Sequence, residues 1–306
     1  MSGRFEGMRL TMRIVQIVWL AGALAASMSS PASAQNSPLL RNPNISYQYI
    51  IPRKPMDPED TLYAKKLAQY NINIAVYERL RQRRVLELLS QFLSPLTLPH
   101  MLALKTDVCG DENAFYNPDD SSFTICYEYV FGTERDAPAA GTATDGITRD
   151  DAIIGGFVNA ALHELGHALF DVYNVPVLGR EEDGADQVAA FVMLQFSKDV
   201  ALTTIKGAAY SYKIQANLGS DAYWDEHGTP AQRFFNYVCI AYGSPHREAF
   251  KSFVDAGLLP ETRAKHCCEE YAQVEKAFRR YILPNINRDL MKIVQETDWL
   301  PKSSGR

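Results

Sequence analysis

One motif constrains the fold and chemistry of this chain more than any other: a His-Glu-x-x-His motif at residues 163–167, within a stretch of helical periodicity. Positions four apart share one face of a helix, so His163 and His167 are expected to present both imidazoles to a single metal ion. Glu164 then projects beside that ion, where a carboxylate can accept a proton from an activated water. The motif predicts a zinc hydrolase centre that still needs a third protein ligand.

The context of the motif favours a buried helix. Asp150 and Asp151 supply acidic residues for its first turn. A broad apolar stripe at helical spacing follows, formed by Ile153, Ile154, Phe157, Val158, Ala161, Leu162, Leu165 and Leu169. The alternative is an amphipathic surface helix with two solvated histidines, and a third ligand argues against it.

That ligand is expected in the acidic segment 180–187, at the head of a helix that is apolar on all sides. Glu182 and Asp186 are four residues apart and share a face. The simplest assignment makes Glu182 the third metal ligand, while Asp186 accepts the other N–H of a metal-bound imidazole, most simply that of His163. Glu181 and Asp183 are expected to point elsewhere. The alternative is that all four acids only favour the helix N-terminus.

These residues resemble the gluzincin pattern of the thermolysin-like zinc peptidases, with a shorter connection between the two halves than in thermolysin. The chain is also similar, over residues 46 to 290, to a family of bacterial metallopeptidases of undefined physiological role. That similarity rests on the metal motif and on Cys109-Gly110, Asn113-Ala114-Phe115-Tyr116, Ile125-x-Tyr127-Glu128, Asp225-Glu226-His227-Gly228, Gln232-Arg233-Phe234-Phe235-Asn236, Cys239 and Leu259-Pro260-x-x-Arg263-Ala264. It implies the peptidase class without indicating a substrate.

The resemblance implies two further features of the site. Gluzincins use a His or Tyr beyond the third ligand to stabilise the oxyanion. His227, in the loop before a helix that begins with a capping box at Thr229, fits that role, with Asp225 or Glu226 to orient it. A loop histidine without a role is the alternative. The strand at 123–128 is expected to be the sheet edge that pairs with an extended substrate, or else a purely structural strand.

The N-terminus reads as a targeting segment. A basic start is followed by an apolar core at 14–26, which is too short for a bilayer span, and Ala32-Ser33-Ala34 resembles a cleavage site. We expect a signal peptide at 1–34, a disordered tail at 35–45 and one domain at 46–300. The protein would then be exported, to the periplasm or outside the cell, with no stable membrane span after cleavage. An uncleaved anchor is the alternative.

Five cysteines suit an oxidising compartment. Cys109 and Cys126 flank a turn between two strands and are expected to pair. Cys239 is expected to pair with one of the adjacent Cys267 and Cys268, and the family pattern favours Cys267. A role for these cysteines in metal binding is the weaker interpretation, because no Cys-x-x-Cys spacing occurs.

The predicted fold is α+β and zincin-like, with a small sheet, a metal-binding helix and a mainly helical C-terminal part. The predicted function is that of an exported peptidase that uses one Zn²⁺ per chain to hydrolyse peptides or proteins. The net charge of −5 argues against nucleic acid as a partner. Two alternatives stay open: a zinc amidase acting on cell-wall peptides, and a catalytically silent binding protein with a zincin fold.

Overall fold

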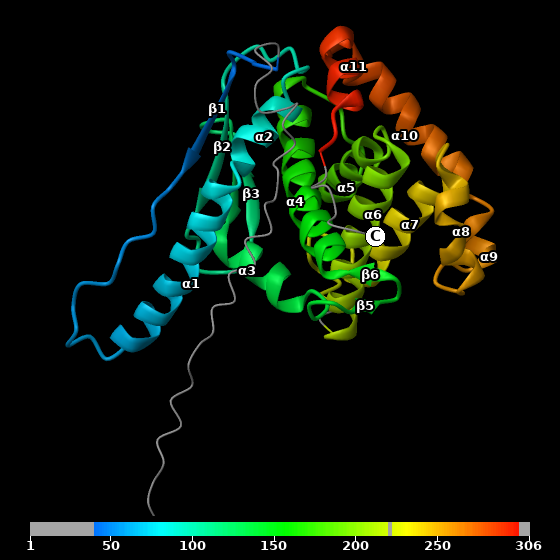
Figure 1. Ribbon diagram of the computed structural model, residues 1–306. Coiled ribbons are helices and arrows are strands. Elements are labelled where there is room, and N and C mark those ends of the chain that lie inside the picture. Colours follow the sequence, from blue (N-terminus) through cyan, green and yellow to red (C-terminus); the bar gives the residue numbers. More distant parts are fainter. Residues whose placement is uncertain (1–39, 220–221, 300–306) are drawn as a thin grey trace, which may run out of the picture.

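The computed structural model describes residues 40–219 and 222–299 and has an α+β fold. A small mixed sheet lies in the N-terminal part of the chain, and the C-terminal part is mainly helical (Figure 1). The predicted fold class is therefore confirmed. Within the described residues, no helix combines the length and the apolar character that a membrane crossing requires.

The main sheet has the strand order β1-β2-β4-β3. Its strands are β1 (Ile45–Tyr49), β2 (Leu102–Asp107), β3 (Ala114–Asn117) and β4 (Ser122–Cys126). β1, β2 and β4 run parallel, and β3 pairs antiparallel with β4 at the edge. The expectation that the strand before the metal helix forms an edge is wrong. β4 lies inside the sheet and is buried along its whole length, because β3 folds back onto it.

Two helices, α1 (Tyr63–Gln82) and α2 (Val85–Phe92), lie in front of this sheet in Figure 1. α1 is continuous from Tyr63 to Gln82. The helices are separated at Arg84, whose φ of 55° lies in the left-handed region. α2 packs against β1 and β2, whereas α4 packs against β3 and β4.

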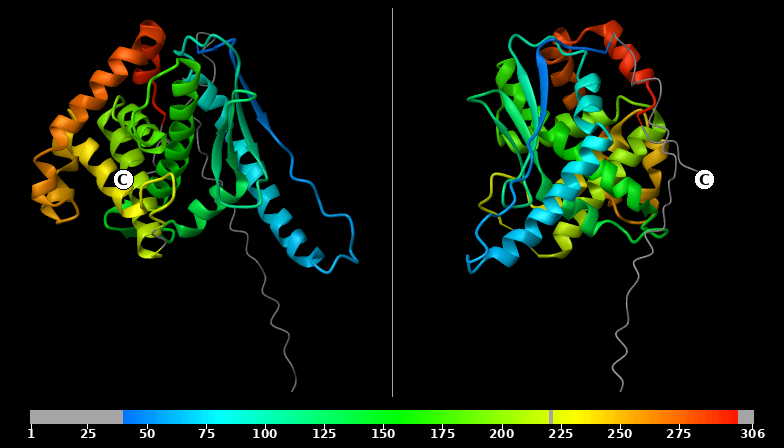
Figure 2. Two further views of the ribbon diagram at one scale, coloured as in Figure 1. Left: turned by 180° about the vertical axis from the view of Figure 1, so that it is seen from behind. Right: turned by 60° about the vertical axis from the view of Figure 1, so that its left-hand side comes forward.

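Most of the remaining chain is helical. After β4 come α3 (Tyr127–Asp136), the short hairpin β5 (Ala143–Thr144) and β6 (Ile147–Thr148), α4 (Arg149–Val172), α5 (Glu181–Met193), α6 (Lys198–Asn217), α7 (Pro230–Gly243), α8 (Arg247–Asp255), α9 (Glu261–Ala264), α10 (Cys267–Tyr281), the 3₁₀ turn η1 (Leu283–Asn285) and α11 (Arg288–Glu296). The strand predicted at 123–128 ends at Cys126, and Tyr127 already begins α3. Figure 2 shows these helices gathered on one side of the sheet.

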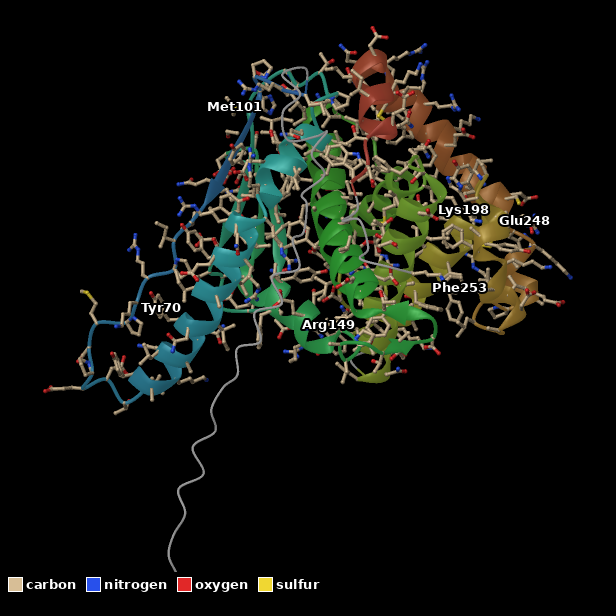
Figure 3. The ribbon with its side chains drawn as sticks, viewed as in Figure 1. Tyr70, Met101, Arg149, Lys198, Glu248 and Phe253 are labelled. Atoms are coloured by element: carbon tan, nitrogen blue, oxygen red, sulfur yellow. A yellow bond between two sulfur atoms is a disulfide. The ribbon has the colours of Figure 1, made fainter. Side chains whose placement is uncertain are left out.

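The helix that carries the His-Glu-x-x-His motif begins with a capping box. The Thr148 side chain accepts a hydrogen bond from the backbone N–H of Asp151, and the Asp151 carboxylate accepts one from the backbone N–H of Thr148. Arg149, labelled in Figure 3, follows at the lower end of α4. The acidic first turn expected from the sequence is therefore part of a complete helix start, preceded by the β5–β6 hairpin.

The chain is packed against the domain from the first described residue. Leu40 is buried, and the side-chain amides of Asn42 and Asn44 donate hydrogen bonds to the carbonyls of Leu96 and Leu98. Residues 40–44 of the segment expected to be disordered are held by these contacts. The expected signal peptide and the start of the tail, residues 35–39, lie outside the described part of the chain.

Two disulfides link segments that are separated in the sequence by 17 and 28 residues. Cys109, two residues after β2, pairs with Cys126, the last residue of β4, and Cys239 of α7 pairs with Cys267 of α10. Cys268 is free and exposed. These are the same pairs that the turn between the strands and the family resemblance indicated.

Candidate metal centre

Close helix contacts bring the acidic segment to the His-Glu-x-x-His motif. Gly166 lies between His163 and His167 on α4, and a Cβ atom at this position would sit only 2.8 Å from Ala185 Cα on α5. Any side chain here would therefore push α5 away. Because Gly166 permits this close approach, the first turn of α5, which contains Glu182, lies opposite the two histidines.

Three donor atoms converge between these helices. His163 Nε2 lies 2.9 Å from Glu182 Oε2, and His167 Nε2 lies 3.3 Å from both His163 Nε2 and Glu182 Oε2. Ligands about 2.0–2.1 Å from a tetrahedral zinc ion are about 3.3–3.4 Å apart. The donor types and their separations fit a single zinc-sized ion held by the three residues, which form the one such group found among the described residues.

His163 is oriented by the carboxylate of Asp186. Its Nδ1 atom lies 2.9 Å from Asp186 Oδ1, and both side chains are buried. Burial disfavours the imidazolium, but the hydrogen bonds with Asp186 and Glu182 outweigh burial and raise the pKa of His163 to about 9 in the absence of metal. With its Nδ1–H engaged by Asp186, His163 has Nε2 left for a metal, the tautomer that zinc requires.

His167 has its own carboxylate partner, which the sequence analysis missed. Its Nδ1 atom lies 2.7 Å from Glu181 Oε1. Glu181 was expected to point away, but as the first residue of α5 it turns back over the end of the motif. Burial lowers the pKa of His167, whereas hydrogen bonds with Glu182 and Glu181 raise it, and the net shift is upward. Asp183, by contrast, pairs with Arg180 and contacts neither histidine among the hydrogen bonds of the described residues.

Glu182 is the common partner of three imidazoles. Its Oε2 atom faces Nε2 of His163, His167 and also His227, the last at 2.8 Å. Burial alone would raise the pKa of Glu182, but these hydrogen bonds hold it far below the ordinary range for a glutamate. The carboxylate is therefore ionised, as a metal ligand must be.

His227 approaches from the loop before α7. The capping box of Thr229 and Gln232 fixes the start of that helix, and His227 lies two residues before Thr229. Its Nδ1 lies 2.9 Å from Asp225 Oδ1, so the two ring nitrogens contact Asp225 and Glu182. The hydrogen bond with Glu182 raises the pKa of His227, and the hydrogen bond with Asp225 raises it by a smaller amount. Burial acts in the opposite direction, and the net shift is upward.

Glu164 follows His163 on α4 and is buried. Burial raises the pKa of its carboxyl above the ordinary glutamate value, although the neighbouring histidines act in the opposite direction. A carboxylate with a raised pKa is a better proton acceptor near neutral pH.

Behind His163 lies a polar cluster that the sequence analysis did not assign. Arg233 of α7 donates from Nε to Asp186 Oδ2 and from Nη2 to Asp186 Oδ1, each at 2.7 Å. The hydroxyls of Tyr212 and Tyr237 donate to the same Oδ1, each at 3.3 Å. Arg233 was part of the family pattern, but neither tyrosine stands at a spacing that relates it to the motif.

The arrangement as a whole could hold a single metal ion: two imidazoles and a carboxylate converge, with a buried glutamate next to one of the histidines. The family model described as "Putative metallopeptidase" matches residues 68–282, which include every residue of this centre. The chain belongs to that family. Comparison with curated proteins and with solved structures finds no match.

Proposed function

We propose that the protein is a zinc-dependent peptidase that holds one Zn²⁺ per chain with His163, His167 and Glu182. The observation that carries this proposal is the convergence of their three donor atoms at separations of 2.9, 3.3 and 3.3 Å. Membership of a metallopeptidase family supports the reaction class. Zinc bound there would act as a Lewis acid, polarising the scissile carbonyl and lowering the pKa of water to about 7.

Glu164 is proposed as the general base. The residue is adjacent to His163 on α4, and its burial leaves it with a raised pKa. It accepts a proton from the water that attacks the peptide carbonyl and then passes this proton to the leaving amine.

His227 is proposed to stabilise the oxyanion. Its Nδ1–H is directed to Asp225, and its Nε2 projects into the centre, where it lies 2.8 Å from Glu182 Oε2. When a carbonyl oxygen gains negative charge beside it, an Nε2–H donor at this position stabilises that charge. The raised pKa of His227 favours the protonated ring that carries this donor.

The edge strand β3 is the proposed site for the substrate backbone. β3 contacts α4, and the Tyr116 hydroxyl donates to Asp171 near the end of that helix. Cys126 donates its backbone N–H to the carbonyl of Asn113, and hydrogen-bonded pairs alternate along an antiparallel ladder. The backbone groups of Ala114 and Tyr116 therefore point away from β4. The Ala114 N–H donates to Asn113 Oδ1 at 2.9 Å, and an extended peptide that adds as a further strand would replace this bond.

We further propose that the protein is exported, with residues 1–34 removed as a signal peptide and residues 46–300 forming the catalytic domain. Two disulfides support this, because such bonds form and persist mainly in oxidising compartments. N-terminal sequencing of the protein recovered from its native compartment tests it, with Gln35 as the expected first residue.

The decisive experiment compares zinc-loaded wild type with Glu164→Gln on a diverse peptide library that includes cell-wall peptides. Glu164→Gln should bind zinc as tightly as wild type and lose at least about 100-fold in turnover. Asp183→Asn is the matched control, because Asp183 lies near the centre but pairs with Arg180. Cleavage by Glu164→Gln at the wild-type rate would refute the role of the base. Hydrolysis confined to cell-wall peptides would identify an amidase, and zinc binding without any hydrolysis would identify a silent binding protein.

A further inference from the structure

The buried carboxylate of Asp186 is the meeting point of four helices. It belongs to α5, and it is contacted by His163 from α4, Tyr212 from α6, and Arg233 and Tyr237 from α7. Its Oδ1 atom receives a donor from each of these four residues, whereas Oδ2 receives only Arg233 Nε among the donors of the described residues. The orientation of Asp186, and through it the ring of His163, is therefore set by groups far away in the sequence.

We propose that Tyr212 is a positioning residue that holds Asp186 in the orientation presenting His163 Nε2 to the metal. This inference rests on the proposed function for the identity of the metal centre. Tyr212 touches no donor atom of that centre, and it acts through Asp186.

The direction of the Tyr212 hydroxyl bond is determined by a second residue. Asn159, one helical turn before His163 on α4, donates from Nδ2 to the Tyr212 hydroxyl oxygen at 2.9 Å. Because that oxygen already accepts a hydrogen bond, its own proton is free to point to Asp186, 3.3 Å away. The resulting chain runs from Asn159 through Tyr212 to Asp186 and back to His163, so it begins and ends on α4.

The side-chain amide of Asn159 contributes to this relay through its N–H donor. Its Oδ1 atom is buried and has no hydrogen-bond partner among the described residues. A flipped amide would place the donor where Oδ1 now lies and would leave the Tyr212 hydroxyl without the bond from Nδ2. Buried acceptors without partners are uncommon in folded proteins. The relay through Tyr212 requires the orientation in which Asn159 Nδ2 faces the hydroxyl.

Tyr212 also supports the other main partner of Asp186. The Arg233 guanidinium carbon lies 4.4 Å from the centre of the Tyr212 ring, within the range of a cation–π interaction. The ring thus backs the guanidinium that grips both carboxylate oxygens, while the hydroxyl contacts one of them. Tyr237 offers a hydroxyl at the same distance from Oδ1, but among the hydrogen bonds of the described residues none is donated to its oxygen by a side chain of α4.

This difference makes Tyr212→Phe and Tyr237→Phe a matched pair. Each change removes one hydroxyl located 3.3 Å from Asp186 Oδ1 and keeps the aromatic ring. We expect Tyr212→Phe to weaken zinc binding about tenfold, at the lower end of the range for groups that orient a metal ligand. Tyr237→Phe should weaken it clearly less. In the Tyr212→Phe background, Asn159→Ala should cause no further loss, because the relay is already interrupted.

Two readouts separate positioning from general destabilisation. The first is the visible absorption spectrum of the Co²⁺-loaded protein, which should shift in Tyr212→Phe because the geometry of the ligands changes. The second is thermal unfolding of the metal-free proteins, in which Tyr212→Phe and Tyr237→Phe should be similar. If Tyr212→Phe is too unstable to purify, Asn159→Ala alone provides the same test, with a weaker expected loss of zinc affinity and a shift of the Co²⁺ spectrum in the same direction.

Equal zinc affinities and equal Co²⁺ spectra for wild type and Tyr212→Phe would overturn the proposal, as would equal losses in the two tyrosine variants. These results are independent of peptide hydrolysis. A wild type that binds zinc but cleaves no peptide would refute the proposed function while leaving the positioning role intact. Conversely, a wild type that cleaves peptides but whose zinc affinity is unchanged by Tyr212→Phe would support the proposed function and refute the positioning role.

Discussion

Replacing Arg233 with an uncharged residue should be among the most destabilising single substitutions in the interior of this fold. Arg233 makes two hydrogen bonds of 2.7 Å to Asp186, and the two side chains are only 15% and 7% exposed. Arg233→Met keeps much of the side-chain volume and leaves the Asp186 charge buried with one cationic neighbour fewer.

The expected loss in the free energy of unfolding of the metal-free protein is about 3 kcal/mol. Breaking a buried ion pair by deleting one partner costs about 3–5 kcal/mol, because the other charge stays buried. We take the lower end because His163, whose pKa is about 9 without metal, still faces Asp186 with a positive charge at pH 7.

Arg135 offers the control. It contacts two carboxylates, those of Glu112 and Asp136, and makes more hydrogen bonds than Arg233 does. However, its side chain is 48% exposed, so water and salt screen these pairs. Arg135→Met should therefore cost about 1 kcal/mol or less.

The assay is urea unfolding of the metal-free protein with its disulfides intact, for wild type, both single variants and the double variant Asp186→Leu with Arg233→Met. The double variant should be more stable than Arg233→Met alone, because no uncompensated carboxylate is left in the core. Similar losses for Arg233→Met and Arg135→Met would show that burial does not determine the strength of these pairs, and the reasoning would fail.

Three further predictions concern the metal centre and the proposed substrate edge. Zinc titration should find submicromolar binding abolished in Glu182→Ala, weakened about tenfold in Glu181→Ala and unchanged in Asp183→Ala; an unaffected Glu182→Ala would eliminate it as a ligand. Because the pKa of His163 is about 9 without metal, the ring is protonated at pH 7 and must lose that proton to bind zinc, so affinity should rise with pH up to about 9. Calorimetry in buffers of different ionisation enthalpy should detect at least about one proton released per zinc at pH 7, and the absence of release would contradict this pKa. Ala114→Pro removes a backbone N–H that points away from β4 and donates to Asn113 Oδ1 in the free protein, so the protein should fold but bind peptides with a raised KM; an unchanged KM would argue against strand addition.

The clustering of the candidate ligand residues could be predicted because their relations are local. His163 and His167 are one turn apart on one helix, and Glu182 and Asp186 are one turn apart on the next. Helical periodicity alone therefore puts each pair on one face. The capping boxes at the starts of α4 and α7 are equally local, and the sequence indicated an acidic first turn for one and a complete box for the other.

The features that could not be predicted depend on contacts between distant segments. β3 forms the sheet edge because it folds back onto β4, while β1 pairs with β2 at the other side. Local sequence patterns do not show which strands pair, so they did not predict this strand order. Glu181 reaches His167 because α5 crosses α4 closely at Gly166. Tyr212 meets Asp186 only through the packing of α6 against α4 and α7.

The segment at 95–97 pairs with residues 285–287, close to the C-terminal end of the described chain. Thr97 donates its N–H to the carbonyl of Asn285, Asn287 donates its N–H to the carbonyl of Pro95, and Leu96 and Ile286 form an isolated bridge between them. A chain emerges N-terminus first from the ribosome or from a membrane pore. The contacts between 95–97 and 285–287 therefore cannot form until residue 287 has emerged. Premature termination before η1 would leave the backbone at 95–97 without these partners, so quality-control proteases would find an open segment beside the sheet in every incomplete copy.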